Sequence, residues 1–106
     1  MARISVKDEY FTTINVFSTT PEHQKRLAEI VVEGAEAMKS QPGFVSASIH
    51  LSYDGTRVVG YAQWASEDDF HGMRARADLQ GHFEEVHELG SIESIACRVA
   101  YTSDED

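Results

Sequence analysis

The chain has 106 residues, of which 42% are hydrophobic and 25% charged, the composition of an ordinary globular domain. Its net charge of −9 disfavours nucleic-acid and anionic-membrane partners, because both attract lysine and arginine. We therefore predict one domain over residues 1–106, with a frayed acidic tail at residues 103–106. Nothing in the first residues resembles a signal sequence, no apolar stretch approaches the ~20 residues of a membrane span, and Cys97 has no other cysteine to pair with in this sequence. We expect a cytoplasmic protein.

The first part of the chain predicts a strand followed by a helix. Residues 10–18 alternate as a strand does, which places Asn15 and Phe17 on one face of a sheet. Thr20, followed by a proline, is a helix-start signal with a capping side chain. Apolar residues then recur at helical spacing within residues 21–41, until a Pro-Gly pair ends the pattern.

The middle of the chain predicts a β-hairpin. The Asp-Gly dipeptide at 54–55 is typical of the tightest turn, in which both central residues take positive φ. That turn would place Ile49 opposite Gly60 and Val45 opposite Trp64. One face of the hairpin then carries small apolar residues and a single large aromatic: Val45, Ala47, Ile49, Leu51, Val58, Gly60, Ala62 and Trp64. A covered face of this kind can enclose a hollow.

The last part predicts a broken helix and a final strand. Ser66, with an acidic residue three positions later, starts the helix as a capping box, and Phe70 and Met73 form its apolar stripe. Two glycines predict an interruption, after which the helix resumes and ends before Gly90. Residues 92–102 are rich in β-branched and aromatic side chains and are predicted to form a strand.

This order, βαββαβ, predicts an α+β fold of the ferredoxin-like kind, with both helices on one face of a four-stranded antiparallel sheet. The helices must cover the face bearing Trp64, because only that face of the hairpin is consistently apolar. The opposite face would still expose Ile14, Val16, Val59 and Tyr61. A second copy of the sheet is the simplest cover, so we predict a homodimer, a dimeric α/β barrel.

Several kinds of chemistry lack their motifs. The sequence has no glycine-rich phosphate loop, no nucleophile elbow and no cysteine pair. Glu84 and His87 form a single Glu-x-x-His step, whereas a carboxylate-bridged di-iron site needs two. Cys97 has no recognisable base partner and is expected to be a small packing residue. We predict no metal site.

Four segments together resemble the antibiotic biosynthesis monooxygenase family. They are PGFVSASIH at 42–50, DGTRVV at 54–59, YAQW at 61–64 and SEDDF at 66–70, within a resemblance that runs from Phe11 to about Val99. The resemblance implies a small ferredoxin-like dimer. It also implies a monooxygenase that oxidises a phenolic polycycle, of the anthrone or hydroquinone type, in antibiotic and aromatic polyketide biosynthesis.

The resemblance also points to site residues. The anthrone oxygenases of this family carry a first-strand Asn, a third-strand Trp, and an Asn four residues before that Trp. Asn15 and Trp64 match the first two positions and are the predicted catalytic residues, while Gly60 stands at the third. In the haem-degrading branch, a Trp and a His lie on the second helical segment. Met73 and Glu84 fall near those two places, which disfavours haem degradation.

An anthrone or hydroquinone carries its own electrons, so the implied reaction needs dioxygen as co-substrate and no cofactor. Asn15 could donate an amide hydrogen bond to a developing phenolate, and Trp64 could supply an aromatic wall. Each also has a structural interpretation, as a satisfied strand Asn and as a core Trp. The predicted substrate-binding residues are Phe17, Ile49, Gly60, Phe70, Met73 and Phe83.

Three alternatives remain open at this stage. His50 has the chemistry of a general base, but the hairpin register places it on the other face, towards the predicted dimer interface. Gly60 removes a polar group that the oxygenase reaction could need, which leaves room for a non-catalytic or accessory domain that binds an aromatic ligand. Oxidation of a smaller quinol is the third possibility.

Overall fold

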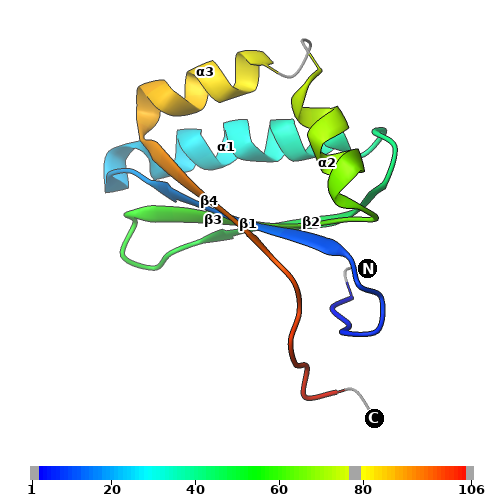
Figure 1. The fold of residues 1–106 in the computed structure, drawn as a ribbon. Helices are drawn as coiled ribbons and strands as arrows, with labels where there is room; N and C mark the ends of the chain where they lie inside the picture. The colour runs from blue at the N-terminus through cyan, green and yellow to red at the C-terminus, as the bar shows by residue number, and fades with distance from the viewer. Residues whose placement is uncertain (1–2, 77–79, 105–106) are drawn as a thin grey trace.

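The computed structural model describes residues 3–76 and 80–104, except for the side chains of residues 80–83. The elements follow the order β1 (Phe11–Ser18), α1 (Pro21–Met38), β2 (Phe44–Leu51), β3 (Arg57–Trp64), α2 (Glu67–Arg74), α3 (Gln80–Leu89) and β4 (Ser91–Cys97). The strands form one antiparallel sheet in the order β2-β3-β1-β4. All three helices lie on one face of it (Figure 1). The predicted ferredoxin-like fold is confirmed.

The hairpin has the predicted register over most of its length, with Ile49 opposite Gly60. Its turn differs from the prediction. Of the Asp-Gly pair only Gly55 takes positive φ, at 80°, and the connection is a longer loop closed by the Ser52 N–H, which donates to the Arg57 carbonyl at 3.0 Å. The wider loop remains ordered because its own side chains supply the hydrogen bonds that a tight turn makes with backbone.

Those bonds converge on Asp54. One carboxylate oxygen accepts from the Thr56 N–H at 2.9 Å, from the Thr56 hydroxyl at 2.7 Å and from the Ser52 hydroxyl at 2.8 Å. The Thr56 hydroxyl, the Thr56 N–H and the Ser52 hydroxyl together lower the pKa of Asp54 to about 2, because they stabilise the charged form. A single ionised side chain therefore organises the turn.

A β-bulge corrects the prediction for Val45. The register shifts between Phe44 and Ser46, so Phe44 rather than Val45 lies opposite Trp64. The two rings meet edge to face, with centroids 5.4 Å apart. One extra residue in β2 reverses the alternation there, so Val45 leaves the inner face and is exposed.

The final strand is shorter than predicted. It ends at Cys97, which lies opposite Thr12 near the start of β1. An edge strand needs a neighbouring strand for its hydrogen bonds, and beyond Cys97 no residue of β4 is paired with β1. The chain continues away from the sheet on the side opposite the helices, and Tyr101 is 78% exposed (Figure 1).

The helix boundaries follow the predicted signals with one exception. Ser66 caps α2 as expected, since its hydroxyl oxygen accepts from the Asp69 N–H at 3.1 Å. The predicted interruption is confirmed, because α2 and α3 are separate helices. Thr20 precedes α1, but its side chain makes no capping bond. Its carbonyl oxygen instead accepts from the Gln24 N–H at 3.0 Å.

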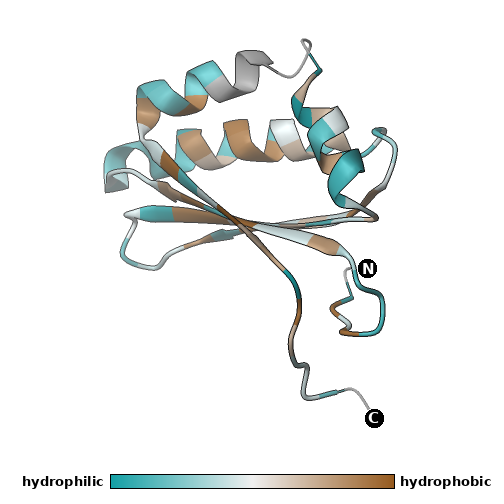
Figure 2. Cartoon of the chain, viewed as in Figure 1, coloured by the Kyte–Doolittle hydropathy of each residue, from teal (hydrophilic) through white to brown (hydrophobic). Residues whose placement is uncertain are grey.

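The core lies between the helices and the sheet, where Figure 2 shows apolar residues gathered on α1 and on the strands beneath it. It divides into two groups. One is centred on Phe17, Leu27 and Ile30, and the other on Trp64 and Met73. No helix in the described part of the chain is both long and apolar enough to cross a membrane.

Candidate functional site

A cavity of about 440 Å³ lies between the sheet and the three helices and borders both core groups. This volume is typical of small-molecule sites, which span roughly 300–1,000 Å³. The cavity exists because small residues face one another across it, Ala47, Gly60 and Ala62 from the hairpin and Gly34 and Ala35 from α1. The hollow predicted from the hairpin pattern is present.

Gly60 widens the cavity without being forced by a close backbone approach. A Cβ atom added there would lie 3.6 Å from the Ile49 Cδ1 atom and 3.9 Å from the Asn15 Cβ atom, which are ordinary contacts. A side chain at this position would therefore project into the cavity beside Asn15. The glycine leaves room on the inner face of the sheet rather than solving a steric problem within the protein.

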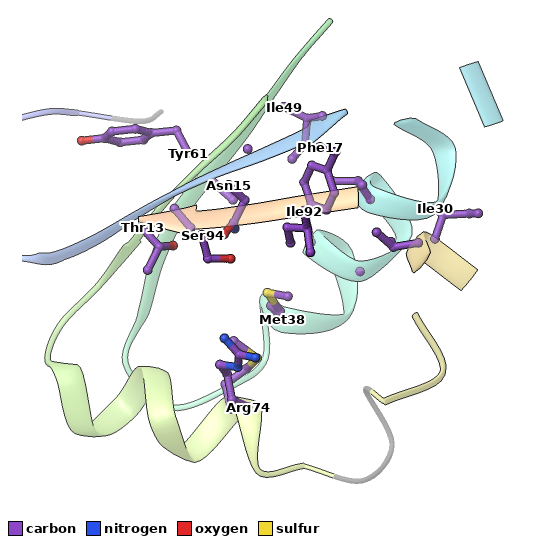
Figure 3. A pocket seen from close by; sticks show the side chains of 18 of the residues that line it. Thr13, Asn15, Phe17, Ile30, Met38, Ile49, Tyr61, Arg74, Ile92 and Ser94 are labelled. Carbon is purple, nitrogen blue, oxygen red and sulfur yellow. The ribbon is translucent and has the colours of Figure 1, made fainter. Parts of the chain in front are cut away.

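Asn15 lies on the sheet side of the cavity. Its Cα atom is opposite those of Gly60 on β3 and Ser94 on β4. Its side-chain amide makes no hydrogen bond to a described residue, and no fully enclosed side-chain nitrogen or oxygen in the described part lacks a partner. The amide must therefore be open to the cavity (Figure 3), where it can bind a ligand oxygen.

Trp64 serves both the core and the cavity. It is only 1% exposed, and its ring packs edge on against Phe44 at 5.4 Å and Phe70 at 6.2 Å. It also borders the cavity, and its indole N–H has no hydrogen-bond partner among the described residues. Trp64 is therefore a core residue and a wall of the cavity at the same time.

The helix side of the cavity carries groups that the sequence analysis did not place there. Arg74 reaches it from α2, with its guanidinium carbon 5.8 Å from the centre of the Phe70 ring. Glu84 and His87 border it from α3. The sequence analysis assigned neither of these last two to the site, yet their spacing of three residues places them on one helix face. The cavity thus has charged and polar side chains opposite its sheet side.

His50 lies where the register predicts, on the open face of the sheet, which is the face opposite the helices. Its Nε2 atom is 3.1 Å from the Ser48 hydroxyl, and it does not line the cavity. Tyr61 borders the cavity from β3, but its ring points away (Figure 3). Neither side chain is placed to act on a molecule in the cavity.

Most of the predicted site residues come together around this one cavity. Those that line it are Asn15, Phe17, Ile49, Gly60, Trp64, Phe70 and Met73. The side chain of Phe83 lies outside the described residues. The roles assigned to these residues stay predictions. Among the described residues, no three His, Cys, Asp or Glu side chains gather closely enough to hold a metal ion.

The protein belongs to the antibiotic biosynthesis monooxygenase family, whose model matches residues 10–89. It is 44% identical over 103 residues to the tetracenomycin-F1 monooxygenase of Streptomyces glaucescens, covering 96% of this chain and 92% of that protein. The resemblance drawn from the four sequence segments is confirmed.

Two solved structures share the fold. A variant of SnoaB, a cofactor-independent oxygenase from Streptomyces nogalater, superposes with a TM-score of 0.84 at 21% identity, covering 92% of this chain and 99% of that one. A monooxygenase of Streptomyces coelicolor, solved in complex with nanaomycin D, superposes with a TM-score of 0.79 at 27% identity, covering 94% and 96%.

Proposed function

We propose that this protein is a monooxygenase of aromatic polyketide biosynthesis that oxidises a phenolic polycycle of the anthrone or hydroquinone type with dioxygen. The observation that carries the proposal is the 44% identity, over nearly the whole chain, to a monooxygenase named for tetracenomycin F1. The cavity supports it independently, because an apolar enclosure with a few polar groups suits a flat aromatic molecule.

The reaction needs no cofactor, because the substrate supplies the electrons. An anthrone methylene loses a proton and gives an enolate, which transfers one electron to dioxygen. The resulting radical pair combines to form a carbon–oxygen bond, the peroxide anion takes back the proton, and the hydroperoxide then loses water. In balance, a methylene group and a dioxygen molecule become a ketone and a water molecule, so the methylene carbon is oxidised and dioxygen is reduced. The protein has to orient the ring, stabilise the enolate and exclude water.

Asn15 is suited to the enolate. Its amide is open to the cavity and fixed in the middle of β1 between two neighbouring strands. A donor that is already in position stabilises a developing phenolate oxygen without having to reorganise. Trp64 offers an aromatic wall, and its N–H can hold a carbonyl or peroxide oxygen.

A second candidate function rests on Gly60. The anthrone oxygenases that the sequence resembles carry an Asn at this position, and this chain has Gly60 there instead. If that amide were indispensable, the protein would bind its aromatic ligand without oxidising it and act as an accessory domain. A smaller quinol is a further possible substrate of the same cavity.

We also propose that the protein works as a homodimer formed through the open face of the sheet. Ile14 and Val16 from β1 stand beside Tyr61 and Val59 from β3 on that face, and Ile95 of β4 is 43% exposed beside them. An apolar patch of this kind in the centre of a sheet favours burial against a second copy. Light scattering at micromolar concentration should give twice the chain mass.

Oxygen uptake tests the proposed reaction. With 1,8-dihydroxy-9-anthrone in metal-free and flavin-free buffer, we expect the wild type to consume dioxygen above the uncatalysed rate. Asn15→Ala should reduce kcat/KM at least tenfold, about 1.4 kcal/mol of transition-state stabilisation. His50→Gln is the matched control, since His50 lies outside the cavity, and it should stay within twofold of the wild type. Equal losses in both variants, or no uptake by the wild type, would contradict the proposal.

A further inference from the structure

The side-chain hydroxyls and the amide on the sheet side of the cavity come from one pair of strands. The residues of β2 and β3 that face the cavity are Ala47, Ile49, Gly60, Ala62 and Trp64, and among them only the Trp64 indole N–H is polar. Tyr61 of β3 also borders the cavity, but its ring points away. The pair β1 and β4 contributes Thr13, Asn15 and Ser94 together with the apolar Phe17 and Ile92.

These three polar side chains have no partners within the described protein. Thr13 is only 3% exposed, yet its hydroxyl makes no hydrogen bond to a described residue. Because no enclosed oxygen or nitrogen in that part of the chain is left unpaired, the hydroxyl must be reachable from the cavity. The Ser94 hydroxyl also makes no hydrogen bond to a described residue, and Ser94 is exposed on the edge strand β4. Figure 3 shows Thr13, Asn15 and Ser94 together on the sheet side, facing Met38 and Arg74.

Their spacing follows from the sheet. Asn15 and Ser94 are directly opposed on neighbouring strands, where Cβ atoms lie roughly 4.5–5.5 Å apart. Thr13 is two residues from Asn15 on one strand, a rise of about 7 Å. The three side chains therefore lie at the corners of a triangle on the cavity wall and do not converge on a single atom of the ligand. Such a triangle fits several oxygen atoms spread along one edge of a fused-ring molecule.

We infer that the substrate carries phenol or carbonyl oxygens along one edge, and that this edge lies over β1 and β4 with Ser94 and Thr13 as specificity-determining residues. The hydrocarbon edge lies over the hairpin, where Gly60 provides room. The buried Thr13 hydroxyl disfavours an analogue that would leave it unpaired, whereas the exposed Ser94 adds a hydrogen bond that only an oxygen-bearing edge can make. This inference rests on the proposed function and names which polycycles the site accepts.

Binding of unreactive quinones tests the inference without turnover. Trp64 is the single tryptophan of the chain, so quenching of its fluorescence reports occupancy of the cavity. The wild type should bind 1,8-dihydroxyanthraquinone at least tenfold more tightly than 9,10-anthraquinone. Ser94→Ala and Thr13→Val, which remove a hydroxyl with little change of shape, should each reduce that preference to threefold or less. Ser91→Ala is the control, because it removes a hydroxyl from the same strand outside the cavity.

Turnover supplies the second measurement. Ser94→Ala should raise KM about tenfold for 1,8-dihydroxy-9-anthrone, leave kcat within twofold, and leave unsubstituted 9-anthrone unaffected. Equal weakening of both quinones, or no preference in the wild type, would overturn the inference. If the protein discriminates between the quinones but consumes no dioxygen, the inference about the substrate edge stands and the proposed oxidation is refuted. If it consumes dioxygen without discriminating between the quinones, the proposed oxidation stands and the inference is refuted. If neither quinone quenched Trp64 and the wild type consumed no dioxygen, both proposals would fail.

Discussion

The two faces of the sheet come from the same strands and have opposite properties. On the helix side, small residues such as Gly60 and Ala62 lie beneath α1, and the layers enclose a cavity instead of a filled core. On the open side, Ile14 and Tyr61 form a flat apolar surface. One end of it is covered, where the Gln63 amide donates to the Arg3 carbonyl at 2.9 Å. The helix side is suited to binding a small molecule, and the open side is suited to packing against another protein surface.

Truncation of Trp64 should have the largest effect and test how far the helix side depends on one ring. Trp64→Ala should lower the free energy of unfolding by about 3–5 kcal/mol, because it removes a fully buried aromatic side chain. Trp64→Phe, the matched variant, should retain most of the stability and lose ligand affinity. Chemical denaturation and quinone titration by calorimetry measure the two. A stable Trp64→Ala protein would show that this face tolerates a larger hollow than its packing indicates.

A charge on the open face should break the proposed dimer. Ile14→Glu places a carboxylate beside Tyr61 and Ile95, which should raise the dissociation constant at least 100-fold, about 2.8 kcal/mol. Val32→Glu is the control, because Val32 is exposed on α1 away from that face. Sedimentation across a concentration series gives the constants. A wild-type monomer, or an Ile14→Glu variant that stays dimeric, would show that the open face has another use.

Filling the room at Gly60 should change selectivity more than stability. Gly60→Asn projects an amide beside Asn15, and we expect kcat/KM to shift by roughly three- to tenfold between large and small polycycles, while the free energy of unfolding changes by less than about 1 kcal/mol. Gly60→Ala separates the effect of the added atoms from that of the amide. If the wild type oxidised no phenol and Gly60→Asn did, the binding-domain alternative would replace the oxygenase.

The smallest effect concerns the hairpin loop, which belongs to neither face. The pKa of Asp54 is lowered to about 2, so its contribution to stability is complete above the unfolded pKa near 4 and is lost as the pH falls through about 2. Asp54→Ala should therefore be slightly less stable than the wild type at neutral pH and equal to it near pH 2. Thermal melts across this range, with Glu33→Ala as an exposed helical control, would detect it. A difference that persists at pH 2 would mean that the carboxylate charge is not the cause.

The sequence alone was sufficient for the order of elements and for much of the site. The Asp-Gly loop and strand alternation set the pairing of Ile49 with Gly60, even though the loop adopts a different turn. The same alternation put Asn15 and Trp64 on one covered face. These predictions succeeded because a period of two and a nearby turn are local properties, which neighbouring residues determine without reference to the rest of the fold.

What the tertiary structure decided depends on residues far apart in the chain. The bulge at Val45 accompanies the packing of Phe44 against Trp64, and β4 ends at Cys97 because β1 begins opposite it. Ser94 meets Asn15 through a strand pairing that spans most of the sequence. Strand pairing at long range reflects the balance of packing over the whole core, which no local pattern of side chains specifies.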